Sequence, residues 1–98
     1  MSADGSATVL IPAPLRRFTN GEAKVQAGGD TIEALIADLE TNFPGIKERI
    51  CEPDGRIRRF VNIFVNGTNI RAGDGALTSV KAGDEIGIVP AMAGGSAR

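Results

Sequence analysis

A chain of 98 residues that is 42% hydrophobic has room for one small domain with a modest core. Its net charge of -1 and its scarce aromatic residues, four Phe in all, give no tendency towards nucleic acid. No apolar run approaches the roughly 20 residues of a membrane span, so we expect a cytoplasmic protein without membrane contact.

The first part of the chain predicts a β-hairpin. Residues 7–11 are rich in apolar and β-branched side chains, which predicts a first strand. Asn20 and Gly21 form a strong turn signal, and residues 22–26 alternate polar and apolar side chains. We expect this second strand to pair with the first, in a register that the 15–19 connection leaves open.

A helix is predicted next. Asp30 with Glu33 three residues later matches a capping box of the acidic kind. An apolar stripe at helical spacing then runs up to Pro44, where the helix must end. The stripe consists of Ile32, Leu35, Ile36, Leu39 and Phe43. We expect it to cover a sheet, and residues 46–51 suit one further short helical turn.

The most strand-like run is residues 59–65, followed by a turn at 66–67 and a short return at 68–70. Alternation divides its side chains between two faces, and Phe60 and Phe64 are expected on the face away from the helix. The opposite, aliphatic set is expected in the core: Val61, Ile63 and Val65.

The final strand is predicted at residues 85–89, after a turn at 81–84 and before Pro90. Four side chains in this strand and in the connection before it are expected in the core: Leu77, Val80, Ile86 and Ile88. Val89 is expected on the opposite face, where Gly87 leaves a shallow depression.

A flexible arm is expected after the final strand. Residues 91–95 are mostly small and reach roughly 17 Å when extended. Ala93, Gly94 and Gly95 suit a narrow channel, because glycines without Cβ atoms allow close approach on every side. The same lack of bulk leaves the Gly95 carbonyl open to attack.

The order of the elements resembles that of the ubiquitin-like β-grasp, an α+β fold with a mixed sheet and one main helix packed on one face. We therefore expect a flexible N-terminus at 1–6, a β-grasp domain at 7–90 and a flexible tail at 91–98. Residues 60–66, 81–86 and 89–95 together resemble the MoaD/ThiS family of prokaryotic sulfur carriers. Within this family, the length and the run at 59–63 are most similar to the carrier of cysteine biosynthesis.

The resemblance implies that the chain is a substrate and not an enzyme. A ubiquitin-activating-type adenylyltransferase would adenylate Gly95, and sulfur would convert it to a thiocarboxylate for a sulfur-accepting synthase. ATP and its metal would act in the activating enzyme, so no cofactor or metal is expected on this chain. The alternatives are a ubiquitin-like protein modifier, a carrier for molybdopterin or another product, and an interaction subunit without tail chemistry.

One departure from the family pattern follows the glycine pair. The family ends there, whereas this chain continues with Ser96, Ala97 and Arg98. The resemblance implies a precursor that a JAB-type metallopeptidase cleaves between Gly95 and Ser96. The alternatives are an artificial addition and a member that no longer carries sulfur.

The sequence also predicts an apolar docking patch, a cysteine without a chemical role and a basic rim. Phe60, Phe64 and Val89 are expected to form a docking patch, unless the N-terminal residues or a second copy cover them. Cys51, the one cysteine in a chain without histidine, is expected to be inert and partly buried. A basic rim is expected to be a solvated face, with docking of an acidic partner as the alternative. The rim consists of Arg56, Arg58, Arg59 and Arg71.

Overall fold

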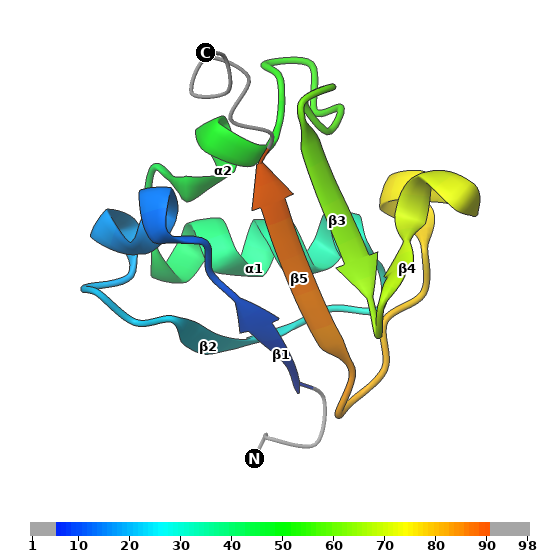
Figure 1. The fold of residues 1–98 in the computed structure, drawn as a ribbon, viewed down its shortest axis with the longest axis horizontal. Helices are drawn as coiled ribbons and strands as arrows, with labels where there is room; N and C mark the ends of the chain where they lie inside the picture. Colours follow the sequence, from blue (N-terminus) through cyan, green and yellow to red (C-terminus); the bar gives the residue numbers. More distant parts are fainter. Residues whose placement is uncertain (1–5, 91–98) are drawn as a thin grey trace, which may run out of the picture.

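The computed structural model describes residues 6–90 and contains a five-stranded sheet (Figure 1). The strands are β1 (Ser6–Leu10), β2 (Lys24–Gly28), β3 (Val61–Val65), β4 (Thr68–Asn69) and β5 (Glu85–Pro90). Two α-helices, α1 (Ile32–Asn42) and α2 (Ile46–Ile50), lie between β2 and β3 in the chain. Three short 3-10 helices occupy connections: η2 (Ala13–Phe18), η3 (Ile70–Ala72) and η4 (Gly75–Leu77). The expected flexible ends lie outside the described residues, except that Ser6 already belongs to β1.

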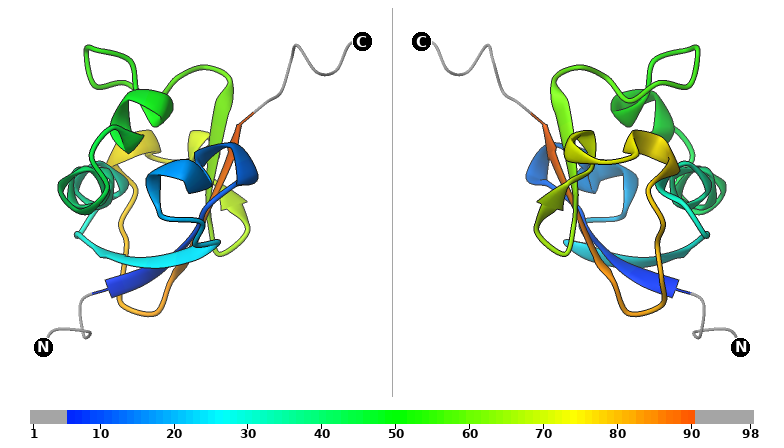
Figure 2. Two further views of the ribbon diagram at one scale, coloured as in Figure 1. Left: turned by 90° about the vertical axis from the view of Figure 1, so that its left-hand side faces the viewer. Right: turned by 90° about the vertical axis from the view of Figure 1, so that its right-hand side faces the viewer.

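The strands lie in the order β2-β1-β5-β3-β4, with β1 parallel to β5 and all other neighbours antiparallel. Both α-helices lie on one side of this mixed sheet (Figure 2). The expected α+β architecture is therefore confirmed. Because β1 and β5 are parallel, β5 ends at the opposite end of the sheet from Ser6 (Figure 1).

The predicted hairpin is confirmed, and its connection is more ordered than a simple turn. Val9 pairs with Val25, and η2 lies in the connection between the two strands. Asn20 has a left-handed φ of 58°, the conformation that the turn signal favours. Thr19 is fully buried, and its hydroxyl donates to the carbonyl of Glu22 at 2.8 Å. This bond fixes the connection against the core.

The expected cap of α1 is wrong by one residue. Thr31 is the N-cap, and its Oγ1 accepts a hydrogen bond from the Ala34 N–H at 3.2 Å. Asp30 instead lies before the cap, where its carbonyl accepts a hydrogen bond from the Val80 N–H at 2.9 Å. This long-range bond, together with the bridge between Thr31 and Ser79, delays the start of the helix.

The core is almost the one expected. The helical stripe buries its first four members, and Phe43 packs partly against them at the helix end. Val61, Ile63, Val80, Ile86 and Ile88 are also buried. Leu77 was expected inside and is 65% exposed. It lies on the tight turn η4, where neighbouring side chains point about 120° apart, so Ala76 faces α1 and Leu77 points to solvent.

The strand boundaries differ from the expectation by one or two residues. β1 is Ser6–Leu10 and not 7–11, and β2 is Lys24–Gly28 and not 22–26. β3 begins at Val61 and not at Arg59, because the Val61 N–H donates to the Arg58 carbonyl in a turn. β5 includes Pro90, which pairs with Val61 across the sheet. Pro90 has no N–H to donate, and its place at the last position of the strand is one that a proline tolerates.

Two turns are joined at the lower end of the sheet in Figure 1. The side-chain amide of Asn66 donates to Asp84 Oδ1 at 3.0 Å, and its oxygen accepts from the Glu85 N–H at 2.9 Å. Asp84 Oδ2 accepts from the Lys81 N–H at 2.9 Å. Both bonds lower the pKa of Asp84 below its usual value, and the bond from the Lys81 N–H has the larger effect.

We predict that Asp84→Ala destabilises the fold by about 1 kcal/mol at pH 7, since these bonds are solvent-exposed. The folded-state pKa is depressed, so this stabilisation is present above the ordinary carboxyl pKa of about 4. It is lost as the pH falls through the folded-state value. Urea unfolding should show the gap between wild type and variant narrowing below about pH 4. Asp74→Ala is the control, because the Asp74 carboxylate makes no capping hydrogen bond within residues 6–90. Equal losses for both variants would show that the hydrogen bonds of Asp84 do not stabilise the fold.

Candidate functional site

The end of β5 is the first component of the site. The residues expected to carry the chemistry or the cleavage, Ala93, Gly94, Gly95 and Ser96, lie outside the described residues. The structure therefore places the root of this segment, at Pro90, and its surroundings. β5 is central in the sheet, with β1 on one side and β3 on the other, so its direction is set by two ladders of hydrogen bonds.

The outer face of the sheet, away from α1, is the second component. Gly87 pairs with Leu10 of β1 and with Phe64 of β3, so the three residues form one row across the sheet. Val89 lies two residues nearer the end of β5, opposite Asn62. Alternation turns these positions outward, because their neighbours in each strand are buried in the core.

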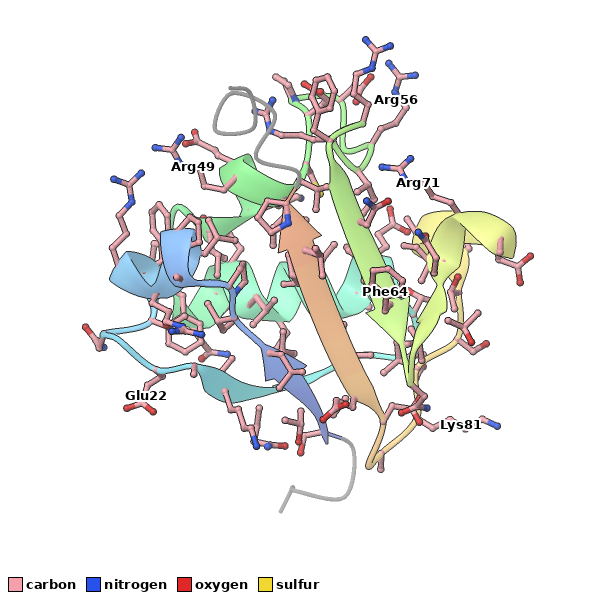
Figure 3. All side chains as sticks on the ribbon, viewed as in Figure 1. Glu22, Arg49, Arg56, Phe64, Arg71 and Lys81 are labelled. Atoms are coloured by element: carbon pink, nitrogen blue, oxygen red, sulfur yellow. The ribbon has the colours of Figure 1, made fainter. Side chains whose placement is uncertain are left out.

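This outer patch, made of Leu10, Phe64, Gly87 and Val89, is only partly exposed. Val89 is 49% exposed, whereas Phe64 and Leu10 are half-buried. A Cβ atom built on Gly87 would lie 4.0 Å from the Phe64 Cβ, so the glycine leaves ordinary contact space beside the ring. The Phe64 side chain lies beside Gly87 on the outer face (Figure 3), and the expected shallow depression at Gly87 stays a prediction.

Phe60 lies apart from this row, just before β3. It is 58% exposed, and the Arg59 guanidinium carbon is 5.6 Å from the centre of its ring. Because Val61 pairs with Pro90, Phe60 is close to the root of the C-terminal segment. Sequence reasoning missed Leu10, although the alternation of β1 around the buried Val9 was the signal that would have found it.

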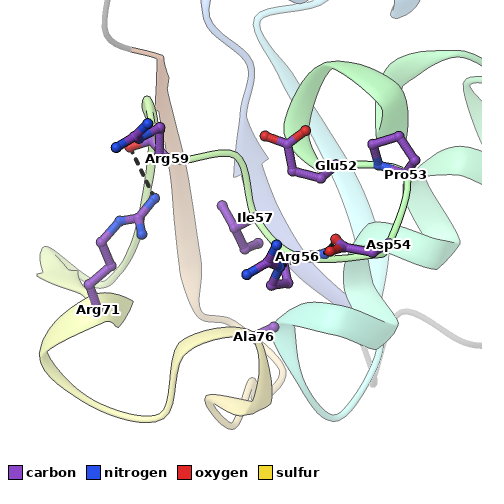
Figure 4. Close-up of a pocket in the computed structure, with 8 residues that line it drawn as sticks. All are labelled: Glu52, Pro53, Asp54, Arg56, Ile57, Arg59, Arg71 and Ala76. Carbon is purple, nitrogen blue, oxygen red and sulfur yellow. Dashed lines mark hydrogen bonds and ion pairs between the residues drawn. The ribbon is translucent and has the colours of Figure 1, made fainter.

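The expected basic rim does not consist of four free charges. The Arg71 guanidinium donates to the carbonyls of Arg58 at 2.9 Å and Val61 at 2.7 Å (Figure 4 shows its further bond to Arg59). Its Nε donates to the side-chain oxygen of Asn62 at 3.3 Å. Arg71 thus ties η3 to the start of β3 and has a structural role.

Two other members of the rim are paired with carboxylates. Arg56 lies 2.9 Å from Asp54, and Arg58 lies 3.2 Å from Glu52. Glu52, Asp54 and Arg56 border an open groove of about 790 Å³ between the 52–59 loop and the 3-10 turns (Figure 4), and Arg58 lies outside its lining. The groove therefore contains charges of both signs that largely satisfy one another.

The remaining chemistry-bearing groups are few. Cys51 is buried, and burial raises the pKa of its thiol. Within residues 6–90, no group of three or more His, Cys, Asp or Glu side chains is arranged to hold a metal ion. No helix in the same range is long and apolar enough to cross a bilayer.

Comparison with known proteins gives a consistent result. Residues 9–95 match the model of the ThiS family, so the matched span ends on Gly95. The chain is 48% identical over 90 residues to the sulfur carrier protein CysO of Mycobacterium tuberculosis, covering 90% of this chain and 97% of that protein. The crystal structure of M. tuberculosis CysO matches with a TM-score of 0.83 over 88% of this chain and 99% of that one, at 45% identity.

Two further relatives are informative. A chain of the Amycolatopsis orientalis BexX/CysO complex matches with a TM-score of 0.85 at 40% identity, covering 89% of this chain and 97% of that one. The small archaeal modifier protein 3 of Haloferax volcanii is 32% identical over 65 residues, covering 66% of this chain and 70% of that protein. The similarity thus extends to a carrier seen in a protein complex and to a protein modifier.

We predict that Arg71→Lys lowers the free energy of unfolding by about 1 kcal/mol, because one ammonium group cannot reproduce the fork of bonds to two carbonyls and Asn62. Arg59→Lys, which keeps the charge at an exposed site without such bonds, should change it by less than about 0.5 kcal/mol. Urea denaturation measures both. Equal destabilisation by the two substitutions would show that Arg71 has no special structural role.

Proposed function

This chain belongs to the ThiS family and is a sulfur carrier, and we propose that the carboxyl group of Gly95 is the group that carries the sulfur. The observation that carries the proposal is the end of the matched family span on Gly95, five residues after the end of the central strand. Five residues span up to roughly 17 Å when extended, enough to bring a carboxyl group into a partner's active site while the folded body stays outside.

The chemistry requires activation, because a free carboxylate is a poor electrophile. We propose that a ubiquitin-activating-type adenylyltransferase joins a carboxylate oxygen to the α-phosphorus of ATP and releases pyrophosphate. A sulfur nucleophile then attacks the acyl carbon, and AMP leaves with the electrons of the broken C–O bond. The product is a thiocarboxylate, whose anionic sulfur is a strong nucleophile for a sulfur-accepting synthase.

In this role the chain is a substrate and not a catalyst. We propose that ATP, its metal and the acid–base groups belong to the activating enzyme, and that the reaction takes place in the cytoplasm. We propose cysteine biosynthesis as the pathway, on the basis of 48% identity to CysO-type sulfur carriers over most of the chain. A carrier for molybdopterin or another product has no comparable support from the relatives described above.

Processing must precede loading if residues follow Gly95. A channel shaped for two glycines excludes a longer segment, and Ser96 would displace the reactive carboxyl from Gly95. We propose cleavage between Gly95 and Ser96 by a JAB-type metallopeptidase. The end of the family match on Gly95 supports this position of the cut.

A second function, protein modification, is favoured by the similarity to the small archaeal modifier protein 3. Both functions pass through the same activated carboxyl group of Gly95. They differ in the attacking group, which is sulfur for a carrier and a lysine amine for a modifier. Conjugates that survive a denaturing gel would identify the second function.

We predict that a variant stopped at Gly95 gains the mass difference of sulfur replacing oxygen when incubated with the adenylyltransferase, ATP, Mg²⁺ and a sulfur source. The full-length chain should stay unchanged, because its terminal carboxyl is not that of Gly95. Intact-mass spectrometry measures both. Loading of the full-length chain at Arg98 would refute the proposal that this chain is an inactive precursor. Failure to load the variant stopped at Gly95 would refute Gly95 as the sulfur acceptor.

We further propose that the outer patch and Phe60 dock on the adenylyltransferase. An apolar strip beside the root of the segment that enters the active site is placed to contact the surface around that entrance. The patch lies on the face without helices, so a partner can reach the backbone over Gly87 (Figure 2).

We predict that Val89→Asp and Phe64→Ala each weaken binding to the adenylyltransferase at least about tenfold, the loss expected of residues at the energetic centre of an interface. Leu77→Asp is the matched control, because Leu77 is exposed and lies on the helix side of the molecule. Isothermal titration measures the affinities, and the thermal midpoint should fall only slightly. A large loss of stability, or equal weakening by Leu77→Asp, would remove the patch from the interface.

A further inference from the structure

Two arginines from separate segments lie over one aromatic ring. The guanidinium carbons of Arg17 in η2 and Arg49 in α2 are 5.0 and 5.8 Å from the centre of the Phe18 ring. Within residues 6–90, the two ion pairs involve other arginines, so no carboxylate lies within 4.0 Å of either guanidinium. The stacked pair, Arg17 and Arg49, is thus held by the ring and not by an acid.

The ring that carries this pair is firmly placed. Phe18 packs against the core, and its neighbour Thr19 is fully buried. A Cβ atom at Gly45 would lie only 3.0 Å from the Phe18 ring, so the absence of a side chain there lets the chain pass close beside it. The positive charges of Arg17 and Arg49 repel each other, and contact with the face of the Phe18 ring offsets only part of that repulsion. An anionic group of a binding partner would offset the remaining repulsion.

The stacked pair lies at the end of the sheet from which the C-terminal segment leaves. Leu10, just before η2, pairs in parallel with Gly87, so η2 follows β1 at the end where β5 reaches Pro90. The last residue of α2, Ile50, accepts a hydrogen bond from the Arg58 N–H, on the segment that enters β3. Arg49 points outward from α2 in the upper part of Figure 3, the end of the view towards which β5 runs.

We propose that Arg17 and Arg49 dock an acidic surface of the adenylyltransferase, formed by Asp or Glu side chains beside the entrance that receives Gly95. This inference rests on the proposed function. Charge complementarity supports it, because fixed guanidinium groups bind carboxylates with two parallel bonds and attract them over several ångströms. Two cations on a chain of net charge -1 are too few for a nucleic-acid surface.

The test measures association of the chain stopped at Gly95 with the adenylyltransferase that loads it. Arg17→Gln and Arg49→Gln should each lower the association rate constant about three- to tenfold at 50 mM salt, with little change in dissociation. The difference should disappear at 500 mM salt, where screening is nearly complete over such distances. Lys81→Gln is the control, because it removes the same charge at the opposite end of the molecule (Figure 3).

Each outcome decides the inference. Equal effects of Lys81→Gln and the arginine variants would overturn it, and so would arginine-dependent binding of a single-stranded RNA, which would assign the pair to nucleic acid. Urea unfolding of each variant checks that the fold is retained. Loading of Gly95 at saturating enzyme should be normal in all variants, so normal loading with unchanged association refutes this inference alone. Absence of loading in the parent chain refutes the proposed function, and the inference falls with it.

Discussion

The parallel pairing of β1 with β5 is the constraint on which the rest of the structure depends. It puts the last strand at the centre of the sheet, between β1 and β3, and carries the chain to the end opposite Ser6. A segment rooted on a central strand has a fixed origin and direction, because two ladders of hydrogen bonds hold that strand. A carrier needs this property, since its partner must meet the same geometry at each encounter.

The same pairing organises the surfaces around that root. It aligns Leu10 with Gly87 and Phe64 on the outer face, and it puts η2 at the end of the sheet where β5 ends. An apolar strip and two guanidinium groups that form no ion pair within residues 6–90 therefore lie at the same end of the sheet. The apolar strip offers area that an interface can bury, and the cations act over a longer range, so the two features suit successive stages of one encounter.

Residue type alone does not determine the roles of the arginines. All four members of the expected rim appear equivalent in the sequence, yet Arg71 bonds to carbonyls, Arg56 and Arg58 pair with acids, and Arg59 lies over a ring. The sequence does not indicate that Arg17 and Arg49 form a pair. Phe18 lies next to Arg17 in the chain, whereas Arg49 comes from a distant segment. Such roles depend on which distant residues meet, and no local pattern contains that information.

The sequence by itself determined the strands, the helix, the turns and the fold class, because alternation, helical spacing and turn residues act over a few neighbours. It also indicated which side chains of β3 and β5 face outward. Only the tertiary structure decided the cap at Thr31 instead of Asp30, the exposure of Leu77, and the membership of Leu10 in the outer patch. Each of these follows from a contact between segments far apart in the chain: the Asp30–Val80 hydrogen bond, the packing of η4 against α1, and the register of β1 with β5.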